Sequence, residues 1–211
     1  MPVQPVHAGV TLAAFVFAAA ASAQSYPEKP IRVLTTGVGG SSDITTRLIA
    51  QGAGGPFAQR MVVENRALVA VELVAAAPPD GYTLLHYSNV AWLMPVLQAG
   101  VPWDVFRDFA PIVLTVSTPN VLVVHPSLPV KSVKELIAFA KARPGQLNYA
   151  STSIGAGNHV AAELFNQMAG VKIVRINYKA MSAGFTDALS GQIQVFFPSA
   201  NSSTPYVKSG R

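Results

Sequence analysis

Hydrophobic positions along the chain follow two alternating patterns. Short runs rich in valine and isoleucine predict β-strands at residues 31–36, 61–64, 82–87, 112–117, 121–125, 147–150, 172–177 and 193–197. Between many of these runs, apolar residues recur at helical spacing and predict helices at residues 42–52, 69–77, 133–141, 158–169, 183–189 and 202–207. The clearest helix begins at Val133 and continues its apolar face at Leu136 and Ala140, behind a Ser132–Glu135 capping box. Strand alternating with helix predicts an α/β protein with parallel, doubly wound sheets.

The alternation breaks at residues 111–129. Two strand-like segments lie there on either side of Ser117-Thr118-Pro119-Asn120, with no helix between them. A crossover between two α/β lobes would produce such a break. The sequence therefore predicts two lobes, lobe one at residues 24–120 and lobe two at residues 121–211.

The N-terminus has the pattern of a secretory signal peptide. An apolar segment runs from Val10 to Ala21 and is followed by Ala21-Ser22-Ala23, a small-x-small cleavage pattern. The segment is shorter than the ~20 apolar residues that a membrane-spanning helix needs. We expect residues 1–23 to be removed on export, although the only basic side chain before the apolar segment is His7. A buried N-terminal helix is the alternative.

Composition removes several classes of function. The chain has no cysteine, which excludes thiol catalysis, disulfides and cysteine-based zinc sites. Its net charge of +5 comes from 15 basic and 10 acidic residues, and the basic residues are scattered singly along the chain. No run interleaves them with aromatic residues, so we expect no nucleic-acid partner and only a mild preference for anions. No carboxylate or histidine cluster indicates a metal.

Two glycine-rich turns carry the candidate chemistry. The first, Gly37–Ser42, includes Gly39, Gly40, Ser41 and Ser42 and leads from a predicted strand into a predicted helix. The second, at residues 151–159, has the same arrangement and includes Ser151, Ser153, Gly155, Gly157, Asn158 and His159. Free amides at a helix N-terminus favour an anion by about 0.3–1 kcal/mol, and by up to ~2 when partly buried. Together the turns predict a cleft that holds an anion from both sides, whereas each turn alone could be an ordinary connection with Ser42 or Asn158 as N-cap.

Motifs of catalysis and nucleotide binding do not occur. The chain has no GxGxxG, no P-loop and no GxSxG nucleophile elbow. His125 and His159 could act as bases, but the sequence places no serine at a nucleophile elbow for them. Asp80-Gly81 indicates a turn, and Trp103-Asp104 is typical of a packed loop.

Longer segments resemble a known family. These are VVENR at 62–66, APPDGYTLL at 77–85, RDFAPI at 107–112 and NVLVVHPSLPVKSVKELIAFAKARPGQLNYAS at 120–151, followed by similar segments at 159–179 and 191–197. In this order they resemble the Bug-type substrate-binding receptors of tripartite tricarboxylate transporters. The resemblance implies a two-lobed fold like that of type II periplasmic binding proteins. It also implies a receptor that closes on a small organic carboxylate and delivers it to the membrane permease subunits of the transporter.

The resemblance also implies ligand contacts, position by position. Family positions are matched in the first turn by Ser41, Ser42 and Asp43, in the second by Ser151, Gly155 and His159, and elsewhere by Asn89 and Tyr178. The first turn is one residue shorter than usual, and residues 67–71 replace a turn that normally faces the ligand. Relatives continue beyond the position of Arg211 and complete lobe one, so here lobe one is expected to be incomplete, with an exposed strand edge.

The leading hypothesis is therefore a periplasmic, monomeric receptor for a small organic carboxylate, with no cofactor and no chemical step. A truncated or degenerate family member that does not bind ligand is the alternative. An anion-directed hydrolase is disfavoured, because the sequence offers no pairing of base and nucleophile.

Overall fold

The computed structural model describes residues 26–53 and 61–210. The predicted signal peptide at residues 1–23 lies outside the described residues. In chain order the elements are β1 (Ile31–Thr35), α2 (Ser41–Gly52), β2 (Met61–Asn65), α3 (Val69–Ala75), β3 (Thr83–His86), α4 (Val90–Leu97), β4 (Val123–Val124), α5 (Val133–Ala142), β5 (Asn148–Ser151), α6 (Gly157–Ala169), β6 (Val174–Asn177), α7 (Met181–Leu189), β7 (Val195–Phe196) and α8 (Ala200–Lys208). None of the described helices is long and apolar enough to cross a membrane.

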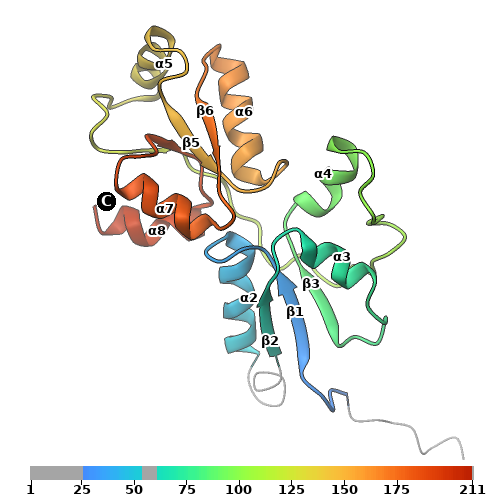
Figure 1. Cartoon of the computed structure of the whole chain (residues 1–211). Coiled ribbons are helices and arrows are strands. Elements are labelled where there is room, and N and C mark those ends of the chain that lie inside the picture. The colour runs from blue at the N-terminus through green and yellow to red at the C-terminus, as the bar shows by residue number, and fades with distance from the viewer. Residues whose placement is uncertain (1–25, 54–60, 211) are drawn as a thin grey trace, which may run out of the picture.

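One sheet is wholly parallel and has the strand order β2-β1-β3 (Figure 1). Its register places Val33 of β1 beside Val63 and Leu84. Helix α2 packs against β1 and β2, and α3 packs against β1 and β3. We call this sheet with α2, α3 and α4 the first lobe. Because its strands are parallel, their carboxyl ends share one edge, and that edge faces the rest of the molecule.

The other sheet has the strand order β4-β7-β5-β6 and, with α5 to α8, forms what we call the second lobe. Strand β5 is parallel to β6 and β7, but β4 is antiparallel to β7. The predicted parallel arrangement therefore holds for β5, β6 and β7 but not for β4. The reason is that the chain enters this lobe beside β7 and the segment that joins β7 to α8, and the two run in opposite directions.

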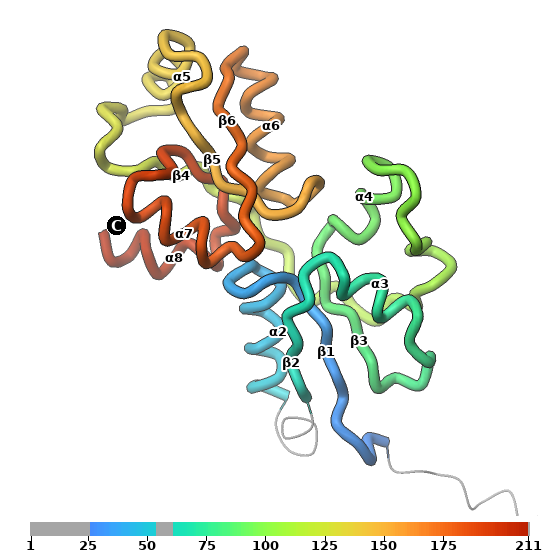
Figure 2. The backbone as a smooth tube through the Cα atoms, viewed as in Figure 1, coloured from blue at the N-terminus to red at the C-terminus, as the bar shows by residue number. Residues whose placement is uncertain are grey.

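The entering segment at residues 119–121 and the segment at residues 198–200 are hydrogen-bonded to each other. The amide of Val121 donates to Pro198 O at 2.9 Å, and the amide of Ala200 donates to Pro119 O at 2.9 Å. Figure 2 follows the chain from α4 along the first lobe and up to β4 in the second.

The predicted strand at residues 112–117 does not form. Ile112, Val113 and Leu114 are 77%, 72% and 81% exposed, and the segment has no strand assignment. A strand needs a hydrogen-bonded neighbour, and none of the described strands pairs with this segment. On the same side of the first lobe, β3 is an edge of its sheet.

Helix α4 is an element that the sequence pattern does not predict. Its segment, VAWLMPVL, contains Pro95, which normally disrupts a helix because it has no amide hydrogen. The carbonyl of Ala91, four residues before Pro95, accepts a hydrogen bond from Trp103 Nε1 at 2.7 Å instead. Trp103 is buried against Met94 in the core of the first lobe. A tertiary contact thus supplies the donor that proline lacks.

The largest core lies in the second lobe. Tyr149 is buried there with Leu136, Val195 and Phe197. Of the apolar face predicted for α5, Leu136 and Ala140 belong to this core, whereas Val133 is exposed. The first lobe has a smaller core around Val71, Val90 and Met94.

The Arg32–Glu64 pair on β1 and β2 gives a pH-dependent stability. Arg32 Nε lies 2.6 Å from Glu64 Oε1, and this hydrogen bond, with help from Arg66, lowers the pKa of Glu64 to about 2 from 4.5. Since the folded pKa is below the unfolded one, the stabilisation is present above about pH 5 and is lost as the pH falls toward 2. Urea unfolding across this range should show Glu64→Gln with a shallower pH dependence than wild type. Glu72→Gln, at a residue with no ion pair among those described, should leave it unchanged; equal slopes for wild type and Glu64→Gln would contradict the prediction.

Candidate functional site

The first glycine turn joins β1 to α2 and is shaped by Asp43. The Asp43 carboxylate accepts hydrogen bonds from the amide of Gly39 at 3.0 Å, from Arg47 Nε at 2.9 Å and from Asn65 Nδ2 at 2.8 Å. Gly39 has a φ of 81°, a conformation that side chains other than glycine rarely adopt. Asp43 is only 3% exposed, so its charge is neutralised within the protein and holds the turn in place.

The N-terminus of α2 carries free backbone donors. Its N-cap is Gly40, with no side-chain cap, and within the described part of the chain the amides of Ser41, Ser42 and Asp43 have no hydrogen-bond acceptor. Helix α5, far from this site, is capped as predicted by Ser132, whose hydroxyl accepts from the amide of Glu135. The alternative with Ser42 as N-cap is wrong, and α2 presents amides that can bind an anion.

The second glycine turn joins β5 to α6. Ser151 is fully buried, and its hydroxyl accepts a hydrogen bond from Arg175 Nε at 2.6 Å. Gly155 has a φ of 79°, and Ala156 rather than Asn158 is the N-cap of α6. The Asn158 side chain bonds instead to the amide of its neighbour His159 at 2.9 Å. Helix α6, like α2, therefore begins without a side-chain cap.

Both turns lie where the lobes meet. The first turn contacts the start of α7, where the amide of Ser182 donates to Val38 O at 3.3 Å. In the second turn, Asn89 Nδ2 from the first lobe donates to Gly155 O at 3.0 Å. The two turns are linked through α7, because Asn158 Nδ2 also lies 3.8 Å from Met181 Sδ.

Helix α8 adds a fourth N-terminus to this junction. Asn201 Nδ2 donates to Ser41 Oγ at 3.0 Å, and neither α7 nor α8 has a side-chain cap. Helices α2, α6, α7 and α8 thus all begin without a side-chain cap at the lobe junction, although the amides of Ser182, Ala200, Ser202 and Ser203 already have backbone acceptors. The positive ends of four helix dipoles at one place create a potential that favours an anion.

Two buried oxygens at the junction have no hydrogen-bond partner among the described residues: Thr36 Oγ1 and Asn201 Oδ1. Thr36 directly follows β1, and a Cβ on Gly40 would lie 3.1 Å from its hydroxyl. Buried polar groups rarely remain unpaired unless water, an ion or a ligand completes them. The sequence prediction missed both residues, although Thr36 directly follows the carboxyl end of β1, where ligands of α/β proteins collect, and Asn201 lies in the first turn of α8.

The remaining predicted residues differ in what they contact. Tyr178 donates its hydroxyl to Asp187 Oδ2 at 2.6 Å, and burial, followed by this hydrogen bond, raises the Tyr178 pKa to about 12. Gly157 lies beside Asn120 of the entering segment, and Ser153 O accepts the amide of Ala156. Tyr178, Ser153 and Gly157 belong to the second lobe, and Asn120 belongs to the segment that enters it.

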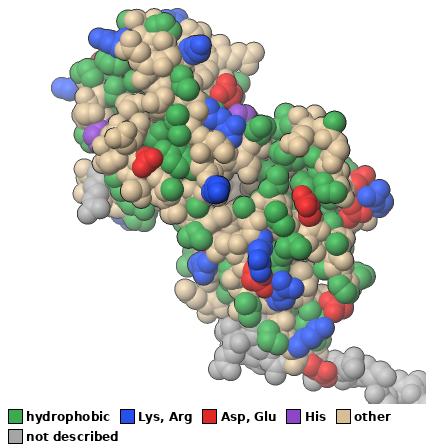
Figure 3. Space-filling view, viewed as in Figure 1, with side chains coloured by type: hydrophobic (Ala, Val, Ile, Leu, Met, Phe, Trp, Pro, Cys, Tyr) green, Lys and Arg blue, Asp and Glu red, His purple; other side chains and the backbone are tan. Residues whose placement is uncertain are grey.

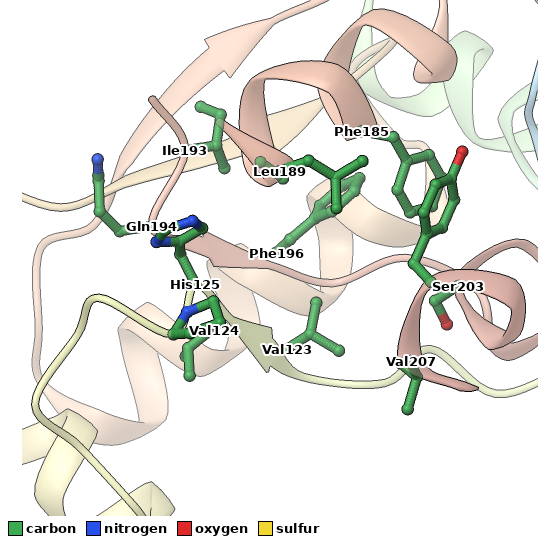
Figure 4. A pocket seen from close by; sticks show the side chains of 13 residues that line it. Val123, Val124, His125, Phe185, Leu189, Ile193, Gln194, Phe196, Ser203 and Val207 are labelled. Atoms are coloured by element: carbon green, nitrogen blue, oxygen red, sulfur yellow. The ribbon is translucent and has the colours of Figure 1, made fainter. Parts of the chain in front are cut away.

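Two hollows lie outside the turns. One is an apolar cavity of about 400 Å³ in the second lobe, where Figure 4 shows His125 and Gln194 at one end and Phe185, Ser203 and Val207 at the other. No lysine or arginine lines it, so it has no counter-charge for an anion. The other is an open groove between α6 and β6, which includes His159 and Arg175.

The described residues form no group of three or more histidine or acidic side chains that could hold a metal. Asp80-Gly81 is the predicted turn: Asp80 Oδ1 accepts the amide of Tyr82, and Gly81 has a φ of 79°. His125 bonds to Ser127 at the surface of the second lobe.

Comparison with known proteins agrees with this geometry. Residues 45–211 match the model of the tripartite tricarboxylate transporter family receptor. BugT of Bordetella pertussis is 32% identical over 209 residues, which cover 96% of this chain and 64% of BugT. A solved structure described as a periplasmic transporter is 35% identical with a TM-score of 0.81, covering 88% of this chain and 64% of that one. The R. palustris protein Rpa4515, solved with adipate, is 30% identical with a TM-score of 0.79 and the same two coverages.

The chain spans less than two thirds of the length of these relatives. The solved structures have the two-lobed architecture of periplasmic binding proteins, as the sequence predicts, with part of it beyond what this chain covers. Family model, sequence identity and fold agree over most of the chain. The chain therefore belongs to the tripartite tricarboxylate transporter receptor family.

Proposed function

We propose that this chain captures a small organic carboxylate at the junction of its two lobes and presents it to the membrane permease subunits of a tripartite transporter. The observation that carries the proposal is the meeting of four uncapped helix N-termini beside two buried, unpartnered oxygens. The adipate in the related R. palustris structure supports a carboxylate as the ligand class. Binding is the whole of the activity, with no chemical step, and it takes place in the periplasm.

In the proposed site the amides of α2 and the hydroxyl of Thr36 donate to the ligand carboxylate. The proposed contacts of the first lobe are Gly39, Gly40, Ser41, Ser42 and Asn89, with Asp43 holding the turn. Those of the second lobe are Ser151, Ser153, Gly155, Gly157, Asn158, His159 and Tyr178. We further propose that the division into lobes falls near residue 120, where Asn120 pairs with Ser199.

Thermal unfolding with added carboxylates tests the function. A ligand at a hundredfold excess over its Kd stabilises a protein by about 2.7 kcal/mol. For a chain of this length, that is a rise in Tm of roughly 5–10 °C. Adipate, succinate and citrate should be compared with sodium chloride at equal ionic strength. A folded sample that responds to none of the carboxylates would favour the alternative of a family member without ligand binding.

Thr36→Val is expected to lower the affinity for the ligand without lowering the stability of the ligand-free protein. Replacing an unpaired buried hydroxyl by a methyl group should leave the ligand-free stability unchanged or slightly higher. Affinity should fall about tenfold or more, because a hydrogen bond to a charged group contributes about 1.5–3 kcal/mol. Calorimetric titration measures the affinity, and urea unfolding measures the stability.

Thr83→Val is the matched control, since Thr83 begins β3 at the end opposite the junction. It should leave the affinity unchanged. If Thr36→Val binds as tightly as wild type, the hydroxyl faces no ligand, and the site must be sought elsewhere at the junction.

A further inference from the structure

Arg175 carries a charge that no acidic residue balances. It lies on β6, an edge strand, and its guanidinium donates to Ser151 Oγ at 2.6 Å, Thr152 O at 2.6 Å and Asn177 Oδ1 at 2.8 Å. All three acceptors are neutral, and Arg175 forms no ion pair with the described residues. The guanidinium is thus fixed in position while its charge remains available.

His159, in the first turn of α6, lies near this charge. Its Nδ1 accepts the amide of Gly155 at 3.3 Å, so the neutral ring carries its proton on Nε2. Burial, followed by the charge of Arg175, lowers the His159 pKa and keeps the ring neutral near pH 7. Its Nε2–H has no acceptor among the residues that the structure describes.

Both side chains line the open groove of about 890 Å³ between α6 and β6. Val160 and Leu164 of α6 form an apolar wall, and Leu97 of α4 reaches in from the first lobe. Two cationic residues, Lys172 and Arg175, and one acidic residue, Glu163, line it. Glu163 already accepts the hydroxyl of Tyr149. Figure 3 shows basic, acidic and histidine side chains close together on this face of the molecule.

We propose that this groove is a second anion site, in which a small oxyanion accepts hydrogen bonds from the Arg175 guanidinium and from His159 Nε2. Carboxylate and phosphate share this chemistry, since a guanidinium donates to both. The groove lies apart from the N-terminus of α2 but shares His159 with the second-lobe contacts proposed above, and it uses Arg175, which that function does not involve. Both donors belong to the second lobe, and Leu97 of the first lobe lines the same groove.

Titration of the wild-type chain tests the proposal directly. The Nε–Hε signal of Arg175, assigned with Arg175→Lys, is followed by NMR while sodium acetate or sodium phosphate replaces sodium chloride at constant ionic strength. We expect a saturable shift with a Kd on the order of 1 mM for at least one of the two. The arm that saturates identifies the source as a carboxylate or a phosphate. A shift that is absent or linear in both arms overturns the site.

Two variants separate a built site from general charge attraction. Arg175→Gln should weaken anion binding by about tenfold or more, while Lys172→Gln, at the far end of the groove, should weaken it less than about twofold. Equal losses in both would overturn the proposal. If Arg175→Gln does not fold, the wild-type titration still decides. Thr36→Val should leave anion binding in the groove intact. A result against the groove site can therefore be distinguished from a result against the carboxylate site at the junction.

Discussion

Gly37→Ala is expected to weaken carboxylate binding by about tenfold to a hundredfold, or about 1.4 to 2.8 kcal/mol. A Cβ at Gly37 would lie 2.9 Å from the backbone oxygen of Lys179 and 3.4 Å from Ala180 Cα. Real Cβ atoms do not approach a backbone oxygen so closely, and neither backbone segment can yield cheaply. Gly37 does not have a positive φ, so alanine creates no local strain. The effect therefore arises only where the two lobes meet.

Calorimetric titration with adipate measures this loss, and Gly52→Ala is the matched control. Gly52 is the last residue of α2 and has no atom within 4 Å of a built Cβ. Alanine there should raise stability by up to about 1 kcal/mol, through helix propensity, and leave the affinity unchanged. If Gly37→Ala binds as tightly as wild type, the contact between the first turn and α7 is absent from the ligand-bound arrangement.

Asp43→Ala is expected to lower the free energy of unfolding by about 2–3 kcal/mol and to abolish the response to carboxylates. The substitution leaves the amide of Gly39 without its acceptor in a buried site, and Asn65 Nδ2 keeps only Thr36 O, at 2.8 Å. Arg47, which is about half exposed, can turn to water, so its share of the loss is small. The turn also loses the hydrogen bond that holds Gly39 in its left-handed conformation.

Urea unfolding measures the stability, and Asp80→Ala serves for comparison. Asp80 pairs with Lys29 at the surface, where both side chains are largely in water. Its removal should have a smaller effect and leave ligand binding intact. A similar loss from both variants would mean that Asp43 contributes only as a surface charge.

Much of the architecture follows from local pattern. Helix α5 begins where Ser132 and Glu135 predict, and α6 ends at Ala169, as its predicted range has it, with Gly170 as a left-handed C-cap. Residues 31–35 form a strand because their apolar run suits a sheet buried between helices, and residues 174–177 form an edge strand whose last two residues are exposed. The two glycine turns were also found from sequence, since strand, glycine and helix start stand in that order.

The sequence predictions are wrong where the local structure depends on residues that are distant in the chain. Residues 112–117 have the composition of a strand, but no described strand pairs with them. The segment of α4 contains a proline, yet Trp103 completes its hydrogen bonding from six positions after the helix ends. The direction of β4 is set by its pairing with β7 at residues 195–196, about seventy residues later in the chain.

The sequence by itself determined the α/β class, the two glycine turns and the likeness to carboxylate receptors, because periodicity, glycine and capping residues act over a few positions. Only the tertiary structure decided which atoms are left free. Asp43 is occupied by Gly39, Arg47 and Asn65, whereas Thr36, Asn201 and Arg175 keep unused hydrogen-bonding capacity or charge. The physical reason is that a polar group's availability depends on every partner that folding brings within about 3 Å, and sequence spacing does not record those partners.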